Sequence, residues 1–505
     1  MKSLPKTLGE LKQSGWQSMP VRMELRRNMM AMMRSGEELF PGILGYERTV
    51  IPQLQHSILA GHDMILLGLR GQGKTKILRM LTRFLDKFIP AVKGSEIHDD
   101  PMAPITRYSR ELIEKNGDET PIEWLNREQR YGEKLATPDT TVGDLIGDID
   151  PIKAASQKRS LSDEEVINYG LIPRTNRGIF VINELPDLQP RIQVALLNIM
   201  QERDIQIRGF NIRIPLDISM AFSANPEDYT SRGNLITPLK DRIDAQIITH
   251  YPKKLETGIK ITRQEARLHS GDQIEIRIPD LCREIVEEVA IAARESEYVD
   301  QKSGVSTRLS ITALEQACSA AERRALNNGS TEEYLRVSDF FHMIPALTGK
   351  LELVYEGEQE GATNVARHLI GLAISRTFSR WYPPTKSRRK KKLEQEPEEQ
   401  RETSEDSSPY RKVLDWFAEG HGVELPDSLT EQEYRKRLKQ VDGLLEIVQE
   451  LRCYREEDEA LLMDLLLEGL HQNSMLGKED VDEERSFQDM LGTMLGRIGG
   501  VDEGL

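Results

Sequence analysis

The sequence predicts an α/β fold that is built on a parallel sheet and followed by a helical region. Three observations lead to this prediction. A phosphate-loop pattern lies between a short apolar run and a helical segment at residues 64–86. A second apolar run, at residues 179–182, ends in two polar residues. After Thr249 the alternation of strands and helices stops, and residues 255–350 have the composition of helices.

The phosphate loop follows the run Met64 to Leu67, which is typical of a buried strand. Its pattern is G-x-x-x-x-G-K-T, and residues 74–86 after it have helical spacing. Glycines turn the backbone N–H groups toward phosphates, the lysine reaches the β- and γ-phosphates, and the threonine hydroxyl binds Mg²⁺. We therefore expect ATP and Mg²⁺ as cofactors. The predicted nucleotide-binding residues are Gly68, Gly71, Gln72, Gly73, Lys74 and Thr75.

The second apolar run ends at Asn183 and Glu184. In phosphate-loop ATPases a strand of this kind ends in two acidic residues. The first holds Mg²⁺, usually through water, and the second polarises the attacking water. Glu184 matches the second role. Asn183, with Thr75, is the predicted metal-site residue; its amide oxygen can accept a hydrogen bond from metal-bound water but brings no charge. The alternative is a strand end with incidental polar residues.

Further stretches complete the α/β region. Residues 204–215 alternate as a β-hairpin, whereas residues 122–134 have a pattern typical of a helix. Residues 219–223 form another strand, and Asn225 at its tip is placed to orient water, although an Asn–Pro turn alone would explain it. Arg242 follows at the edge of this region. It could insert into a neighbouring subunit's nucleotide site or form a surface ion pair.

With these motifs the sequence resembles an AAA+ ATPase of the magnesium-chelatase ATPase-subunit (I subunit) group, close to the MoxR-type ATPases. The resemblance covers roughly residues 38–350. It is carried by residues 68–75, 170–178 (Gly-Leu-Ile-Pro-Arg-Thr-Asn-Arg-Gly), 179–185, 224–228 and 238–242. It implies a three-layer AAA+ core with a parallel sheet, an α-helical lid and a C-terminal helical extension.

The resemblance also implies roles for single residues. By this resemblance Asn225 is the sensor-1 residue, Arg242 is the arginine finger, and Arg308 is the sensor-2 residue of the lid. Residues 140–156 become similar to a helix-2 insert, and residues 205–214 to the hairpin placed before sensor 1. In such ATPases both elements push on partners. The predicted catalytic residues are Glu184, Asn225, Arg242 and Arg308.

Composition shifts divide the chain into five predicted parts. A helical leader (1–38) precedes the α/β ATPase domain (39–252) and the α-helical lid (253–382). A charged linker (383–409), expected to be disordered, then leads to a small acidic helical C-terminal region (410–505).

Charge and cysteine content narrow the function classes. The net charge of −15 disfavours a protein that coats nucleic acid, including a helicase. No uncharged run of about 18 residues occurs, so we predict no membrane span. Cys282, Cys318 and Cys453 lack the spacing of a metal site or a disulfide framework. We therefore expect a reducing, cytoplasmic location.

The resemblance implies an ATP-hydrolysing motor that works as a homo-oligomeric ring, expected to be a hexamer. The motor would drive remodelling or metal insertion in a partner, by resemblance a protein with a von Willebrand A domain. Tetrapyrrole metallation stays open, because another subunit handles the porphyrin in that family. Two alternatives remain. Asn183 keeps open a nucleotide-gated scaffold with weak hydrolysis. A sigma-factor-dependent transcription activator is disfavoured, because the Gly-Ala-Phe-Thr-Gly-Ala loop of that class is missing.

Overall fold

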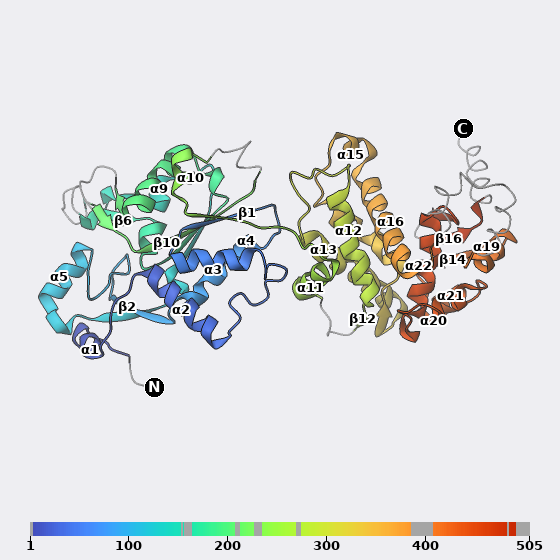
Figure 1. Ribbon diagram of the computed structural model, residues 1–505, viewed down its shortest axis with the longest axis horizontal. Coiled ribbons are helices and arrows are strands. Elements are labelled where there is room, and N and C mark those ends of the chain that lie inside the picture. The colour runs from blue at the N-terminus through green and yellow to red at the C-terminus, as the bar shows by residue number, and fades with distance from the viewer. Residues whose placement is uncertain are drawn as a thin grey trace. The chain divides into compact units, whose positions relative to one another are not determined.

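The computed structural model describes residues 4–152, 155, 164–207, 213–226, 235–268, 274–384, 408–481 and 484–490. The chain forms two compact units, Met1–Tyr251 and Pro252–Leu505 (Figure 1). Several predicted features lie partly outside the described residues. These are the insert (153–154 and 156), the hairpin tip (208–212), positions 227–228 of the sensor-1 motif, most of the linker (385–407) and the C-terminal end (491–505).

The first unit is built around a five-stranded sheet in which every strand pair is parallel. Its three central strands, β1 (Met64–Leu67), β10 (Ile218–Ala224) and β7 (Gly178–Asn183), are buried along their whole length. Their near-continuous apolar sequence follows from this position, because a parallel sheet is covered on both faces. The strand order is β11 (Ala245–Ile248), β1 (Met64–Leu67), β10 (Ile218–Ala224), β7 (Gly178–Asn183) and β4 (Tyr131–Leu135).

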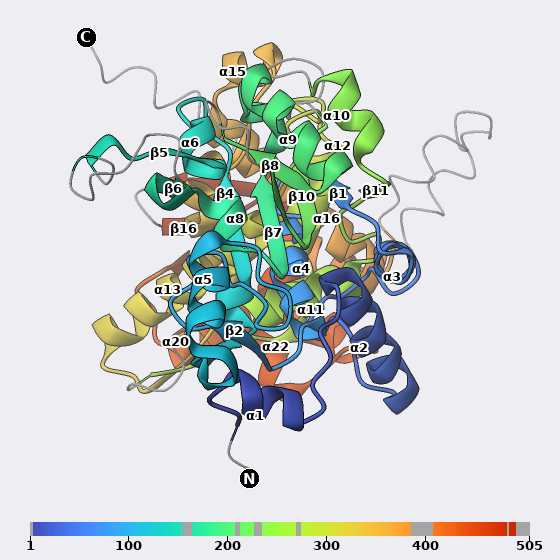
Figure 2. The same cartoon turned by 90° about the vertical axis from the view of Figure 1, so that its left-hand side faces the viewer.

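Alternate residues of these strands face two separate cores. Leu67 and Phe180 pack in the core that includes α9 (Pro190–Glu202), on the side where α10 (Thr237–Arg242) also lies. Leu66 and Val181 pack with the helices of the other face, α2 (Val21–Ser35), α3 (Val50–Ala60) and α4 (Lys74–Met80). Figure 2 shows the strands of the sheet between these two sets of helices. The predicted three-layer α/β core is therefore confirmed.

The remaining elements of the first unit are short. The helix expected at residues 74–86 is confirmed as α4, continued by a 3₁₀ turn at Leu81–Phe84. The hairpin is confirmed, because β8 pairs antiparallel with β9. The other helices and strands are α1 (Leu8–Gln13), β2 (Phe88–Val92), α5 (Arg107–Asn116), β3 (Ile122–Asn126), α6 (Val142–Leu145), β5 (Gly147–Ile149), β6 (Ile167–Tyr169), α8 (Leu171–Arg174), β8 (Asp204–Gln206) and β9 (Arg213–Pro215).

The helix predicted at residues 122–134 is wrong. This stretch contains β3, which pairs antiparallel with β2, a 3₁₀ turn at Glu128–Arg130, and β4, which pairs with β7. The stretch is rich in Glu, Arg and Gln, which favour helices. Pairing with two existing strands outweighs that local preference, because strand formation depends strongly on tertiary context. The correction places Glu133 in the main sheet.

The second unit is mainly helical, and one hydrophobic core runs through it from Cys282 to Phe487. Residues on both sides of the predicted linker contribute to this core. Its helices are α11 (Leu255–Glu265), α12 (Asp280–Glu295), α13 (Arg308–Asn328), α14 (Ile344–Thr348), α15 (Tyr355–Glu360), α16 (Ala362–Trp381), α19 (Arg411–Ala418), α20 (Glu431–Leu438), α21 (Leu444–Gln449) and α22 (Glu459–Gln472), with a 3₁₀ helix at Val337–Met343.

Two small sheets accompany these helices. β12 (Glu275–Arg277) pairs with β13 (Glu332–Tyr334) in parallel. Near the C-terminus, β14 (Val423–Pro426), β16 (Glu484–Gln488) and β15 (Gly477–Val481) form an antiparallel sheet that the sequence did not predict. None of the described helices has both the length and the apolar character needed to cross a membrane.

Candidate nucleotide-binding site

The predicted phosphate loop connects β1 to α4. Gly71 and Gly73 have φ angles of 72° and 74°. Residues with side chains rarely adopt this left-handed region, so the observed loop requires glycine at both positions. Gly68 is required by packing instead, because an added Cβ would lie 2.0 Å from the Thr249 hydroxyl oxygen. The loop therefore has the backbone that a phosphate-binding turn needs.

The side chain of Lys74 is buried within this loop. Its ammonium donates hydrogen bonds to the backbone carbonyls of Gly68 and Leu69, the latter at 3.1 Å. It also donates to the side-chain oxygen of Asn225 at 2.8 Å. These acceptors are what a buried ammonium requires. The loop consequently has a positive charge at its centre.

Asn225 connects Lys74 to Glu184. Its amide nitrogen donates to Oε2 of Glu184 at 3.0 Å, while its amide oxygen accepts from Lys74. These residues follow three adjacent strands, β1, β7 and β10, at the carboxyl edge of the sheet. Ligands of open parallel sheets bind at this edge. Three residues that the sequence singled out thus form one hydrogen-bonded chain.

Glu184 has a backbone conformation that is rare for a residue with a side chain. Its φ and ψ angles are 54° and 48°, directly after β7. A left-handed non-glycine residue costs about 1–3 kcal/mol and is found where the surrounding structure fixes it, often at functional sites. Here the conformation places the carboxylate against Asn225.

The amide of Asn183 is held from both sides. The Ser223 hydroxyl donates to its oxygen at 2.9 Å, and its nitrogen donates to Oε1 of Glu133 at 2.7 Å. Glu133 comes from β4 and also accepts two hydrogen bonds from Arg79 of α4, at 2.8 and 3.1 Å. Sequence reasoning missed Glu133, because residues 122–134 were interpreted as a helix. Residues 131–135, Tyr-Gly-Glu-Lys-Leu, have no apolar–polar alternation that would have marked this strand.

The other predicted loop residues lie around the same turn. The side chain of Gln72 is buried and accepts a hydrogen bond from Thr249 at 2.6 Å. Thr75 is half-buried in the first turn of α4. The Tyr46 hydroxyl, which the sequence did not indicate, lies 2.9 Å from the Gln72 carbonyl oxygen and 2.7 Å from that of His250. Burial raises the pKa of Tyr46 to about 12, so this hydroxyl stays neutral.

The two predicted arginines lie outside this hydrogen-bonded chain. Arg242 ends α10, and its guanidinium donates to the Gln201 side chain at 2.9 Å and to the Pro238 carbonyl at 2.8 Å. Within the described residues, no hydrogen bond links it to Glu184. Arg308 is exposed at the start of α13 in the second unit. The roles expected for both arginines remain predictions.

The residues present fit a nucleotide with Mg²⁺. Mg²⁺ prefers oxygen ligands and is usually held by one or two carboxylates together with substrate phosphates. The site offers the Thr75 hydroxyl, the Asn183 amide oxygen and the Glu184 carboxylate as oxygens, and Lys74 as the cation for phosphates. These groups match the phosphate-loop ATPase pattern except at Asn183, where that pattern has a carboxylate.

Comparisons with known proteins identify distant relatives. The chain is 26% identical over 229 residues to the magnesium-chelatase 38 kDa subunit of Rhodobacter capsulatus, covering 45% of this chain and 59% of that subunit. It is 27% identical over 232 residues to the same subunit of Cereibacter sphaeroides, covering 45% and 63%. The match thus spans about three fifths of these relatives. No family model matches the chain. The relationship supports the AAA+ family.

Solved structures show only a weak likeness. A structure of the complex between subunits BchI and BchD of magnesium chelatase has a TM-score of 0.33 and 20% identity, covering 64% of this chain and 98% of that chain. A putative ATPase from Cytophaga hutchinsonii has a TM-score of 0.29 and 17% identity, covering 72% and 97%. TM-scores this low carry no conclusion about function.

Proposed function

We propose that the chain is an AAA+ ATPase that binds ATP with Mg²⁺ at the loop between β1 and α4 and hydrolyses it to ADP and phosphate. The hydrogen-bonded chain Lys74–Asn225–Glu184 is the main support. It joins a phosphate-binding cation to a carboxylate through an amide, at the sheet edge where nucleotides bind. The distant relationship to magnesium-chelatase 38 kDa subunits points to the same class.

Each group at the site then has a defined role. The loop N–H groups and Lys74 bind the phosphates, and Thr75 and Asn183 hold Mg²⁺. Glu184 orients and polarises the attacking water, and Asn225 positions that carboxylate relative to Lys74. Bound Mg²⁺ would neutralise charge that develops on the phosphates.

We further propose a homo-oligomeric ring. Arg242 of one subunit would stabilise the transferring phosphate in the next, and Arg308 would couple the helical region to the nucleotide. The sequence resemblance is the support for these roles, for the von Willebrand A partner, for metal insertion as the output and for the MoxR-like placement. A cytoplasmic location rests on the cysteines alone.

Glu184→Gln separates binding from hydrolysis. Glutamine keeps the shape and a hydrogen-bonding oxygen but cannot act as a carboxylate. We expect ATP turnover to fall by about 100-fold or more, because general-base catalysis contributes about 10²–10⁴-fold, while nucleotide affinity stays within about threefold. Steady-state phosphate release and ADP binding by the purified chain measure the two quantities. Unchanged turnover would contradict the role of Glu184.

Protein concentration tests the shared site. If Arg242 acts on a neighbour, turnover per chain rises with concentration, and Arg242→Ala abolishes that rise. Lys240→Ala, a change of another basic residue of α10, is the matched control and should keep the rise. Tight ATP binding without turnover at any concentration would instead favour the nucleotide-gated scaffold, the second candidate, which the missing charge at Asn183 supports.

A further inference from the structure

The candidate Mg²⁺ site lacks a charge at the position where phosphate-loop ATPases have the first of two carboxylates. Asn183 takes that position and is neutral. Its amide is nevertheless oriented, because Nδ2 donates to Glu133 and Oδ1 accepts from Ser223. The carboxylate that this amide contacts directly is Glu133, whose Oε1 lies 2.7 Å from the amide nitrogen.

The strand register brings Glu133 to the correct face of the sheet. β4 runs parallel to β7, with Glu133 opposite Val181 and Leu135 opposite Asn183. Residues opposite each other in a parallel pair project to the same face, and side chains alternate along each strand. Val181 packs in the core that includes α4. Glu133 and Asn183 thus project to the face of the helix that begins with Lys74 and Thr75.

Arg79 is the cation that contacts Glu133 in the structure. It follows Thr75 by four residues on α4, so both lie on one side of the helix. Its guanidinium binds both carboxylate oxygens, at 2.8 and 3.1 Å, but the Arg79 side chain is 64% exposed and that of Glu133 is 20% exposed. Ion pairs with an exposed partner contribute little stability and can exchange.

We propose that Glu133 supplies the negative charge of the Mg²⁺ site, acting through Asn183, and that Arg79 competes with Mg²⁺ for this charge. The inference rests on the proposed nucleotide site and adds a positioning residue from a neighbouring strand. Two residues thereby replace the first carboxylate of the phosphate-loop ATPase pattern: Asn183 on β7 provides the oxygen, and Glu133 on β4 provides the negative charge. A purely structural ion pair is the competing explanation.

The two explanations predict different directions for the change in Mg²⁺ affinity that two single variants cause. If the pair is structural, Glu133→Gln and Arg79→Gln have the same effect, because each breaks the same contact. If Glu133 serves Mg²⁺, removing Glu133 weakens the metal and removing Arg79 strengthens it. Gln at position 133 still accepts the hydrogen bond from Asn183, so only the charge is lost.

The experiment is a Mg²⁺ titration of the full chain with a fluorescent ADP analogue, compared with the same binding in excess chelator. For Glu133→Gln we expect the Mg²⁺ half-saturation concentration to rise about 10–100-fold, as for other groups that support a metal ligand. Binding in chelator should not change. For Arg79→Gln we expect the half-saturation concentration to fall about two- to fivefold. Glu133→Gln combined with Asn183→Asp should restore the wild-type value.

The outcomes are distinct. Shifts in the same direction for both single variants, or no shift for Glu133→Gln, would overturn the assignment of Glu133 while leaving the nucleotide site intact. Absence of any ADP binding by the wild-type chain would overturn the nucleotide site and the assignment together. If Glu133→Gln does not fold, Arg79→Gln and the double variant decide, because both retain one carboxylate at the site.

Discussion

Two arginine–glutamate ion pairs, one formed by Arg130 and the other by Glu133, differ in their exposure to solvent. Arg130 binds Glu24 of α2 through two hydrogen bonds of 2.7 Å, and the two side chains are 1% and 5% exposed. Arg79 binds Glu133 with similar distances, but these side chains are 64% and 20% exposed. The guanidinium–carboxylate pair of Arg130 and Glu24 is therefore shielded from solvent, whereas that of Arg79 and Glu133 is accessible to it.

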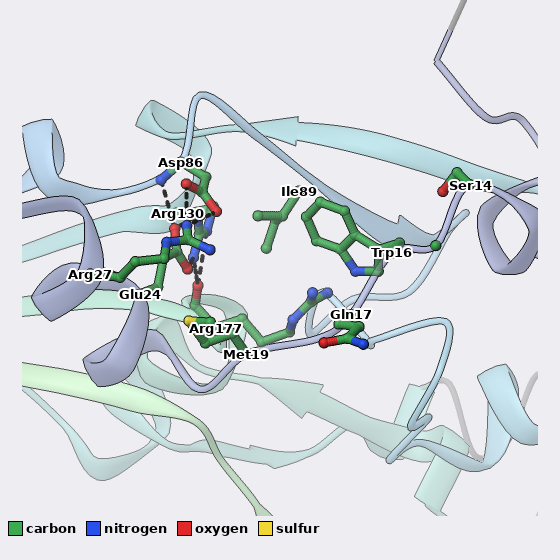
Figure 3. Close-up of a pocket in the computed structure, with 11 residues that line it drawn as sticks. Ser14, Trp16, Gln17, Met19, Glu24, Arg27, Asp86, Ile89, Arg130 and Arg177 are labelled. Atoms are coloured by element: carbon green, nitrogen blue, oxygen red, sulfur yellow. Dashed lines mark hydrogen bonds and ion pairs between the residues drawn. The ribbon is translucent and has the colours of Figure 1, made fainter. Parts of the chain in front are cut away.

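The buried pair lies beside a cavity of about 320 Å³ that is lined in part by residues 14–19, between α1 and α2 (Figure 3). Both oxygens of Glu24 are bound by Arg130, and Oε1 also accepts from the Asp86 backbone N–H at 2.6 Å. Arg27 in turn binds the Asp86 carboxylate at 2.6 Å. Arg130 also donates to the Arg177 carbonyl at 2.9 Å. These hydrogen bonds fix α2 to the 3₁₀ turn Glu128–Arg130 that precedes β4.

The two pairs therefore differ in burial rather than in geometry. Removing one partner of a buried pair leaves an uncompensated charge, which is strongly destabilising. Removing one partner of an exposed pair leaves a charge that water can solvate. Disrupting the buried Arg130–Glu24 pair should therefore lower stability, whereas disrupting the exposed Arg79–Glu133 pair should change metal binding.

The largest effect on stability is expected for Arg130→Met. It leaves Glu24 buried without its cation, so we expect a loss of about 3–5 kcal/mol in the unfolding free energy. Amide hydrogen exchange of β7 in the full chain measures this for the first unit alone, since two compact units need not unfold together. Arg79→Met is the matched control and should cost less than about 1 kcal/mol.

A second variant shows whether the loss comes from the charge. Arg130→Met combined with Glu24→Leu removes both charges, and replacing a buried pair by apolar groups is often nearly neutral. Most of the lost stability should return. Equal losses in Arg130→Met and Arg79→Met would contradict the distinction between the two pairs.

The next effect concerns binding rather than stability. Lys74→Ala removes the ammonium that the loop carbonyls and Asn225 surround, so we expect ADP affinity to fall about 10–100-fold, the value of one hydrogen bond to a charged group. Titration with a fluorescent ADP analogue measures this. Lys76→Ala, an exposed lysine two residues later on α4, should bind ADP as the wild type does. Similar losses for both would mean that the loop lacks a specific phosphate contact.

The parts of the site that the sequence predicted are those that a local motif encodes. Lys74 and Asn225 are 151 residues apart, but each belongs to a recognisable strand–loop pattern. Glu133 and Asn183 are only 50 residues apart, yet no motif marks Glu133, and its strand is rich in helix-favouring residues. Its position follows from pairing in the sheet, which depends on tertiary context. The short strands of the C-terminal sheet were missed for the same reason.

The smallest effect comes from an ion pair of intermediate exposure in the second unit. His342 binds Asp427 at 3.0 Å, and their side chains are 35% and 19% exposed. The hydrogen bond and charge of Asp427 raise the pKa of His342; Asp339 raises it further, and burial and Arg323 oppose this. A raised folded pKa means that the pair adds stability below the unfolded value of about 6.5 and loses it as pH rises through the folded value.

The His342–Asp427 pair tests whether the contribution of an ion pair to the unfolding free energy decreases gradually as its side chains become more exposed. Since water screens His342, we expect less than about 1 kcal/mol between pH 5.5 and 8.5. Amide exchange of α13 across that range measures the change, and His342→Gln should remove the part that belongs to this pair. Asp427→Asn should remove the same part, because it cancels the charge that raises the pKa. A loss as large as that of Arg130→Met would show that a partly buried ion pair can stabilise the fold as much as a fully buried one. Exposure would then not explain a small stabilising effect of the Arg79–Glu133 pair.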